Sequence, residues 1–263
     1  MYEELYAALP DPDRYLERIA FRGSVAHSQE ALSGLAFAHQ KAVPFENFDI
    51  CELGRPIILE IQHLYEKIVL NKRGGYCFEL NAGFASLLTS LGFEVWPILA
   101  RIYRAAFGEQ PMPPMHRVNL TCIGDKKYLT DVGFGGPMPA GALLLEEDIL
   151  QEVWGIRYRF ERRPHNRWIL FRETSEKTMD PMIGFTEAPS EPVDFLTPNY
   201  QCSTHPDSMF TKNRMANIRF DDGFASINSG QFHLVQGGAD VTRPVESKEQ
   251  ERSLLKDYFG IIL

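Results

Sequence analysis

The spacing of hydrophobic residues predicts a helical first third of the chain. Apolar side chains recur there every three or four positions, which is the period of one helix face. Four helices are expected: one that starts at Pro12, one that follows Ser28, one over residues 59–70, and one that starts near Cys77. Asp11 and Ser28 are good N-terminal caps for the first two helices, since their side chains accept hydrogen bonds from free backbone N–H groups.

After Gly92, which suits the end of a helix, the hydrophobic period shortens to two residues. Such alternation is typical of strands, and Gly124 with Asp125 supplies a two-residue hairpin turn between two of them. The pattern therefore predicts a β-rich middle region, either a small barrel or a sandwich. Its strands are expected over residues 95–103, 116–123, 127–132, 154–160 and 168–171.

From about residue 189 the chain becomes rich in proline and irregular, and then regains order. Three short strands are expected at residues 216–220, 224–227 and 232–235, with a closing helix at 247–258. The order of elements predicts three domains. They are a helical bundle over residues 1–92, a β-barrel over 93–190 and an α/β lid over 191–263.

Composition narrows the class of protein. The 263 residues are 44% hydrophobic and 24% charged, which is ordinary for a globular protein and excludes a disordered or fibrous chain. A net charge of −8 makes the chain a poor general binder of nucleic acid. With no long apolar run and an acidic start, we expect neither a membrane span nor a signal peptide. The four cysteines form no CxxC pair, so no metal site is implied, and a cytoplasmic enzyme or binding protein remains.

The most unusual local sequence is residues 73–79, which read Arg-Gly-Gly-Tyr-Cys-Phe-Glu. The two glycines permit a tight backbone path, and Cys77 then falls at the start of the fourth predicted helix. Unpaired N–H groups and the helix dipole favour a thiolate at that position, and a thiolate is the species that attacks electrophiles. Cys77 is therefore a candidate nucleophile, the alternative being a buried small hydrophobic residue.

A histidine and an aspartate are expected on the predicted hairpin. His116 shares the inward face of its strand with Val118, and the turn at residues 124–125 makes Asp131 its diagonal neighbour on the same face. Together with Cys77 they are the parts of a nucleophilic triad, in which His116 takes the thiol proton and Asp131 orients the imidazole. The alternative is that His116 is a structural core histidine.

Five segments of the chain resemble the arylamine N-acetyltransferases and follow one another in the same order as in that family. The most specific is residues 73–81, which read Arg-Gly-Gly-Tyr-Cys-Phe-Glu-Leu-Asn. The other four are Val-Pro-Phe-Glu-Asn at 43–47, His116 with its strand, Asp-Val-Gly-Phe-Gly at 131–135, and the stretch from Asp194 and Phe195 to Ser-Thr-His-Pro at 203–206.

The resemblance implies an α+β fold with a helical bundle, a β-barrel and an α/β lid, and a catalytic core arranged as in cysteine proteases and transglutaminases. It also implies a ping-pong reaction without a metal. Cys77 takes an acetyl group from acetyl-CoA, and an arylamine, hydrazine or N-hydroxyarylamine then accepts it.

The resemblance further implies contacts with both substrates. An apolar wall for the acyl group and the aromatic ring is expected from Phe45, Ile102, Phe134 and Phe210. Contacts with CoA are expected from Gly133, Gly135, Gly136, Thr204 and Ser208. Ordinary core packing and plain turns are the alternatives. Glu46 and Arg73 are interpreted as an ion pair that braces the cysteine loop, and residues 105–114 as an irregular loop over the site.

Three other functions use the same residues differently. An amide synthase, or a transferase with a longer acyl-CoA or a carrier-protein thioester as donor, would keep the fold and the triad. A cysteine hydrolase would need the thiolate but not CoA. A binding module would need no chemistry at Cys77.

Overall fold

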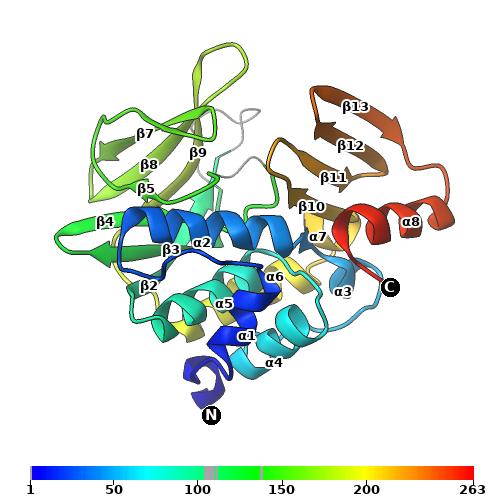
Figure 1. Ribbon diagram of the computed structural model, residues 1–263, viewed down its shortest axis with the longest axis horizontal. Coiled ribbons are helices and arrows are strands. Elements are labelled where there is room, and N and C mark those ends of the chain that lie inside the picture. The colour runs from blue at the N-terminus through cyan, green and yellow to red at the C-terminus, as the bar shows by residue number, and fades with distance from the viewer. Residues whose placement is uncertain (1, 104–109, 111, 137–138) are drawn as a thin grey trace.

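The computed structural model describes residues 2–103, 110, 112–136 and 139–263. Figure 1 shows three parts: a group of helices at the base, a strongly curved sheet above it, and a second sheet to the side. The N-terminus lies at the base, and the C-terminus lies beside the second sheet (Figure 1). The α+β fold expected from the sequence is confirmed.

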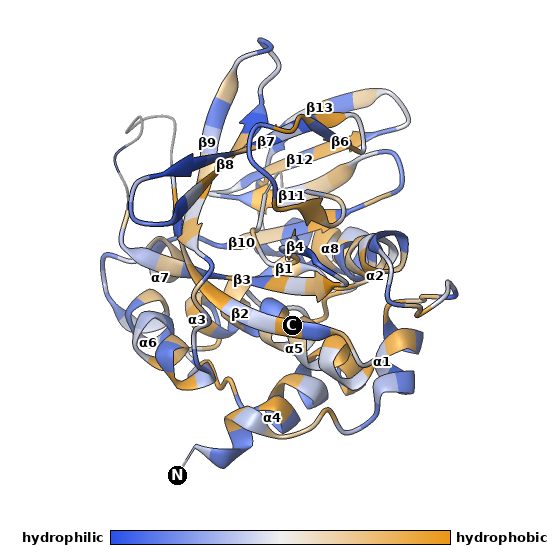
Figure 2. Cartoon of the chain, turned by 90° about the vertical axis from the view of Figure 1, so that its left-hand side faces the viewer, coloured by the Kyte–Doolittle hydropathy of each residue, from blue (hydrophilic) through white to orange (hydrophobic). Residues whose placement is uncertain are grey.

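The helical part begins where the sequence predicts. Asp11 accepts a hydrogen bond from the Arg14 N–H, and Ser28 accepts one from the Ala31 N–H, so both caps act as expected. Hydrophobic and hydrophilic residues lie side by side along α1 and α2 (Figure 2), which is why each buries one face. The elements are η1 (Glu3–Tyr6), α1 (Pro12–Arg18), α2 (Gln29–Ala42), β1 (Phe45–Glu46), α3 (Phe48–Cys51), α4 (Ile61–Tyr65), η2 (Glu66–Leu70) and α5 (Cys77–Ser90).

The third predicted helix differs from a regular one. Residues 61–65 are α-helical, but η2 is a π-helix, in which the Asn71 N–H bonds to the Glu66 carbonyl five residues back. The wider turn accompanies Lys67, a charged side chain that is only 7% exposed. The spacing of hydrophobic residues does not predict a π-helical turn, because such a turn depends on the partners of one buried charge.

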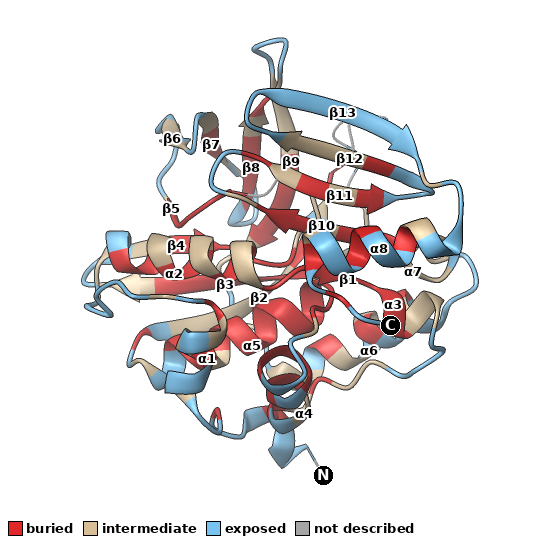
Figure 3. Ribbon diagram, turned by 45° about the vertical axis from the view of Figure 1, so that its right-hand side comes forward, coloured by how far each residue is buried: buried red, intermediate tan, exposed pale blue. Residues whose placement is uncertain are grey.

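Helix α5 forms the centre of the molecule. Most of its residues are buried (Figure 3), and it packs against β2 and β3 of the curved sheet as well as against α1 and α4. Leu80, Phe84, Leu87 and Leu88 are fully buried, as the period of this segment predicts. The start of α5 is consequently fixed with respect to both the helical part and the sheet.

The curved sheet has eight strands in the order β5-β4-β3-β2-β9-β8-β7-β6. Its first and last strands meet through the Gln151 side chain, which accepts from the Leu144 N–H at 2.7 Å and donates to the Leu144 carbonyl at 2.8 Å. These bonds link the edges of a nearly closed barrel. The strands are β2 (Glu94–Ile102), β3 (Pro114–Ile123), β4 (Lys126–Thr130), β5 (Leu143–Leu144), β6 (Gln151–Val153), β7 (Ile156–Arg163), β8 (Arg167–Glu173) and β9 (Met179–Thr186).

The predicted hairpin forms in the predicted register. Ile123 pairs with Lys126 and Asn119 pairs with Thr130, as a two-residue turn at Gly124 and Asp125 requires. The strand predicted at residues 154–160 starts later than expected, however. Trp154 and Gly155 have φ values of +55° and +74°, so they form a turn between β6 and β7. β9 was not expected from the sequence.

The C-terminal part contains a five-stranded sheet in the order β1-β10-β11-β12-β13. Phe45 of β1 pairs with Asn217 of β10, which joins this sheet to the N-terminal part. The division into domains at residues 92/93 and 190/191 stays a prediction. The elements are η4 (Pro192–Phe195), α6 (Leu196–Thr204), α7 (Met209–Lys212), β10 (Met215–Arg219), β11 (Phe224–Asn228), β12 (Gln231–Gln236), β13 (Ala239–Pro244) and α8 (Lys248–Phe259).

A buried histidine in α2 makes stability depend on pH. His39 is 0% exposed, its Nε2 lies 3.0 Å from the Tyr15 hydroxyl, and burial lowers its pKa to about 3. Below about pH 6.5, His39 binds a proton in the unfolded chain but stays neutral in the folded chain. The free energy of unfolding therefore falls as the pH drops. We expect His39→Gln to remove about 2 kcal/mol of the loss between pH 7.5 and pH 5, measured by urea unfolding. His165→Gln, in an exposed turn, is the control, and an equal flattening by both variants would contradict this role of His39.

Candidate active site

Cys77 is the first residue of α5, as the sequence predicts, and it is 3% exposed. The loop before it is held by Glu79, whose carboxylate accepts a hydrogen bond from the Tyr76 N–H at 3.0 Å. Gly75 is needed for this fold of the loop, because a Cβ at this position would lie 2.7 Å from a carboxylate oxygen of Glu79. The loop thus holds Cys77 at a defined position between the helices and the barrel.

His116 and Asp131 lie in direct contact. His116 Nε2 is 2.6 Å from Asp131 Oδ2, and both side chains are 1% exposed. Because the aspartate occupies Nε2, Nδ1 is the ring nitrogen that remains for another partner. The ring of Phe134 packs against the imidazole edge to face, with centroids 5.5 Å apart and planes at 90°. The imidazole is therefore fixed in position by one hydrogen-bonded carboxylate and one aromatic ring.

Asn81, one helical turn after Cys77, connects the three segments that carry these residues. Its Nδ2 donates to the Arg117 carbonyl at 2.6 Å and to Asp131 Oδ1 at 2.9 Å, and its Oδ1 accepts from the Val132 N–H at 3.0 Å. The role of Asn81 was not predicted. Its spacing of four residues from Cys77 is the signal, since residues four apart share one face of a helix.

Cys77 and His116 line one cavity of about 410 Å³. The four residues expected to form an apolar wall line it too: Phe45, Ile102, Phe134 and Phe210. Cavities of this size hold small organic ligands. Met112 and Pro113 also contribute, whereas residues 105–109 and 111 of the loop expected over the site lie outside the described residues.

The residues expected to contact CoA are divided between two places. Gly133 and Ser208 line the Cys77 cavity, whereas Gly135 and Gly136 line a second cavity of about 420 Å³. Phe45 lines both cavities and stands between them. The hydroxyl of Thr204 lines neither cavity and donates to the Tyr200 carbonyl at 2.6 Å, which is a local helix contact.

Two of these glycines have a packing reason in the structure. A Cβ at Gly133 would lie 2.8 Å from Cys77 Cα, and one at Gly135 would lie 2.6 Å from the Phe45 ring. Gly133 therefore allows the loop after β4 to lie against the start of α5. A Cβ at Gly136 would meet only the Phe134 ring, at 3.8 Å, so no close contact restricts this position.

The electrostatic setting of Cys77 differs from that of an exposed helix N-terminus. Burial raises the pKa of the Cys77 thiol, and Cys202 and Asp131 raise it further, whereas the backbone N–H groups of Arg117 and Phe78 lower it. The helix N-terminus thus acts in the expected direction, but burial outweighs it. A thiolate can form here only if its proton passes to a neighbouring group rather than to water.

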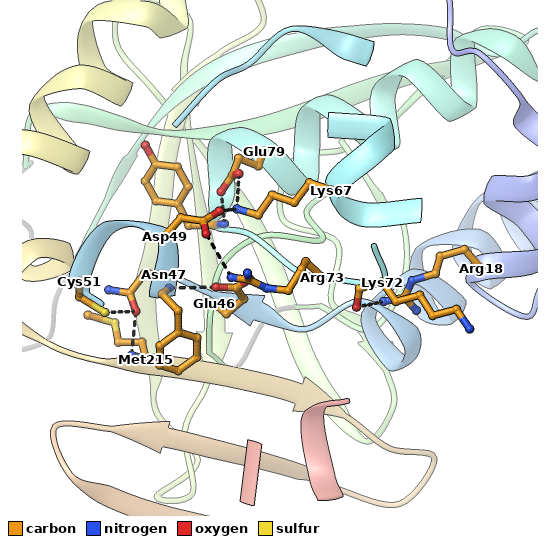
Figure 4. A network of polar contacts seen from close by, with 12 residues as sticks. Arg18, Glu46, Asn47, Asp49, Cys51, Lys67, Lys72, Arg73, Glu79 and Met215 are labelled. Carbon is orange, nitrogen blue, oxygen red and sulfur yellow. Dashed lines mark hydrogen bonds and ion pairs between the residues drawn. The ribbon is translucent and has the colours of Figure 1, made fainter. Parts of the chain in front are cut away.

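Buried ion pairs brace the loop that precedes Cys77 (Figure 4). Arg73 Nη2 lies 2.7 Å from Glu46 Oε1, which confirms the ion pair expected from the sequence. Lys67 lies 2.5 Å from Asp49 and 2.7 Å from Glu79, the residue that also holds the Tyr76 N–H. The π-helical turn η2 thus places the Lys67 cation between α3 and α5. In the sequence, the only sign of this role is that a lysine occurs within a predicted apolar helix.

Three further findings concern the whole of the described chain. Among the described residues, no group of three or more histidine, cysteine, aspartate or glutamate side chains could hold a metal ion. None of the described helices is long and apolar enough to cross a membrane. All four cysteines are free thiols.

The fold and the site place the chain in a known class. The N-acetyltransferase family model matches residues 28–263. The arylamine N-acetyltransferase of Mycobacterium tuberculosis is 30% identical over 95% of this chain and 89% of its own length. The chain belongs to the arylamine N-acetyltransferase family.

Two other relatives bear on the substrates. A Salmonella typhimurium protein named arylamine N-acetyltransferase / N-hydroxyarylamine O-acetyltransferase is 33% identical over 88% of this chain and 82% of its own length. The Mycobacterium marinum arylamine N-acetyltransferase, solved in complex with CoA, superimposes with a TM-score of 0.88 at 29% identity, covering 95% of this chain and 93% of that one.

The ion pair between Glu46 and Arg73 should matter for stability rather than for the thiol. Glu46→Gln keeps an oxygen that can accept from Arg73 but removes the nearest negative charge and leaves Asp49 at 3.4 Å, so we expect the variant to lose up to about 3 kcal/mol in urea unfolding. The rate of Cys77 alkylation in the folded variant should stay within twofold of wild type. Asp221→Asn, which breaks an exposed pair with Lys41, should cost less than about 1 kcal/mol. Unchanged stability of Glu46→Gln would disprove the bracing role.

Proposed function

We propose that this protein transfers an acetyl group from acetyl-CoA to an arylamine, a hydrazine or an N-hydroxyarylamine, through a thioester on Cys77. The observation that carries the proposal is the 2.6 Å contact between His116 Nε2 and Asp131, beside a cavity that both Cys77 and His116 line. Membership of the family, and the names of the Salmonella and M. marinum relatives, support the choice of acetyl donor and acceptors.

In the first half of the reaction, His116 Nδ1 accepts the proton of the Cys77 thiol, and the sulfur attacks the acetyl carbonyl. The bond between that carbonyl and the sulfur of CoA breaks, and the imidazolium returns the proton to the departing CoA sulfur. Asp131 stabilises the imidazolium and fixes its orientation. This assignment fits the burial of Cys77, because the proton moves within the site and not to water.

In the second half, the amine of the acceptor attacks the thioester carbonyl. His116 takes a proton from the attacking nitrogen, the bond between Cys77 and the acetyl group breaks, and the proton returns to the sulfur. An amine competes well against water for a thioester in a cavity that is lined mainly by apolar side chains.

The two cavities suggest where the substrates lie. The acetyl group and the aromatic ring belong in the Cys77 cavity, against Phe45, Ile102, Phe134 and Phe210. The remainder of CoA fits the second cavity, where Gly135 and Gly136 leave the backbone accessible and Arg172 and His233 supply donors for phosphate oxygens. Ser208 is then a contact at the Cys77 side, whereas Thr204 keeps only its local helix bond. The cytoplasmic location expected from the sequence stays a prediction.

Intact mass spectrometry after mixing the protein with acetyl-CoA alone tests the donor and the nucleophile together. We expect a gain of one acetyl group, mapped to Cys77 by peptide analysis and discharged by an added arylamine or hydrazine. Cys77→Ala should gain nothing, whereas Cys51→Ala, at a cysteine that does not line the cavity, should behave as wild type. A folded wild-type protein that acquires no acetyl group would reject acetyl-CoA and leave other acyl-CoA or carrier-protein thioesters as donors.

Asp131→Asn tests the orientation of the imidazole. An amide NH₂ opposite Nε2 favours the tautomer that carries its proton on Nδ1, and this tautomer cannot accept the Cys77 proton. We expect acetylation of Cys77 to slow by roughly a hundredfold or more, measured by rapid quench and mass spectrometry. Asp125→Asn, in the exposed hairpin turn, is the matched control. Near-wild-type acetylation by a folded Asp131→Asn variant would refute the role of Asp131.

A further inference from the structure

Arg117, the residue after His116, is a buried cation without an anionic partner. Its side chain is on the opposite face of β3 from that of His116, and the residue is 5% exposed. The guanidinium carbon lies 4.5 Å from the centre of the Phe195 ring, and Nε has no hydrogen-bond partner. Within the described part of the chain, no carboxylate lies at ion-pair distance from Arg117.

Two other cations in the described interior have strong polar partners. Lys67 contacts Asp49 and Glu79, and Arg18 donates to three carbonyl oxygens. An unpaired buried charge costs several kcal/mol. An arginine without such partners therefore implies that a negative charge forms near it during the reaction.

The backbone of Arg117 joins its charge closely to Cys77. Its N–H group lowers the pKa of the Cys77 thiol, and its carbonyl accepts from Asn81 Nδ2 at 2.6 Å, so the backbone of Arg117 acts on two successive turns of α5. Burial lowers the pKa of Arg117 to about 9, and a negative charge on Cys77 raises it. At neutral pH the guanidinium therefore remains charged.

The charges around Cys77 balance only if Arg117 is counted. His116 and Asp131 face the sulfur from the barrel, and Cys202 faces it from α6. On α5 itself Glu79 is neutralised by Lys67, and the neighbouring Tyr76 hydroxyl has its pKa raised by burial. When the proton moves from Cys77 to His116, the thiolate, the imidazolium and the Asp131 carboxylate carry a net charge of −1. Arg117 brings that sum to zero.

We propose that Arg117 is a positioning residue whose buried positive charge stabilises the Cys77 thiolate from the side opposite the cavity. Arg117 does not line the Cys77 cavity, so it acts through the sulfur and not on the substrate. This inference rests on the proposed role of Cys77 as nucleophile. Lysine is the conservative replacement that keeps the charge, and methionine keeps the apolar stem without it.

The test is the pH dependence of Cys77 alkylation by iodoacetamide in the folded protein, followed by peptide mass spectrometry, which needs neither CoA nor an acceptor. In Arg117→Met we expect the apparent pKa of alkylation to rise by at least one unit and the rate at pH 7 to fall at least tenfold. Arg117→Lys should stay within threefold of wild type. The free energy of unfolding, from urea, should not fall in Arg117→Met, because an unpaired buried charge is replaced by an apolar side chain.

The control variant is Arg159→Met on β7. Arg159 also has an unpartnered Nε and a guanidinium over an aromatic ring, that of Phe171, but Glu161 neutralises it. It should leave the alkylation profile unchanged. Arg117→Gln, which also removes the charge, gives the same answer if Arg117→Met does not fold.

Each outcome either supports or overturns the proposed role of Arg117. A wild-type alkylation profile in a folded, uncharged Arg117 variant would overturn the inference and leave the proposed function intact. Failure of wild-type Cys77 to react faster than Cys202, which lines the same cavity and whose pKa burial raises to about 11, would overturn both. A rise in the pKa of alkylation that lysine reverses supports the inference.

Discussion

The side-chain amide of Asn81 is the contact on which the arrangement of the site depends. A single planar group donates to β3 through the Arg117 carbonyl, donates to the Asp131 carboxylate, and accepts from the backbone of the loop after β4. The backbone carbonyl of Asn81 also accepts from Asn119 Nδ2 at 2.9 Å. Because Asn81 lies one turn after Cys77 on a buried helix, these bonds fix the helix start, the histidine strand and the aspartate loop to one another. Aspartate or leucine would not reproduce two donors and an acceptor in this geometry.

Burial strengthens the electrostatic interactions of the site and raises the free energy needed to form charges there. Cys77, His116 and Asp131 are each at most 3% exposed, so charges there interact strongly but are also expensive to create. A proton that moves from sulfur to imidazole separates charge without changing the total, and the surrounding protein must already hold the balancing charges. Lys67 and Arg73 offset two of the three negative charges of Glu46, Asp49 and Glu79, the carboxylates that hold the cysteine loop. Position and charge are thus set by the same contacts.

Features governed by neighbouring residues could be predicted from the sequence. The caps at Asp11 and Ser28, the register of the hairpin and the start of α5 each depend on a few adjacent residues, and each is confirmed. The prediction was wrong in two segments whose local pattern was misread. Residues 154–155 form a turn, and α6 was not expected because its segment is rich in proline. The roles of Asn81 and Lys67 also escaped prediction, because each depends on partners from segments that only the fold brings together.

The small cavity beside Cys77 explains why the proposed reaction needs two separate half-reactions. Behind the sulfur, α5 packs on β3 with Arg117 and Asn81 filling the interface, so substrates reach Cys77 only from the cavity side. Phe45 lines both that cavity and the second one, and it belongs to β1, which pairs with β10 of the C-terminal sheet. The thioester end of CoA and the amine of an acceptor therefore compete for the same small space beside one sulfur. The donor has to leave before the acceptor can attack, and the covalent thioester keeps the acetyl group in place between the two events.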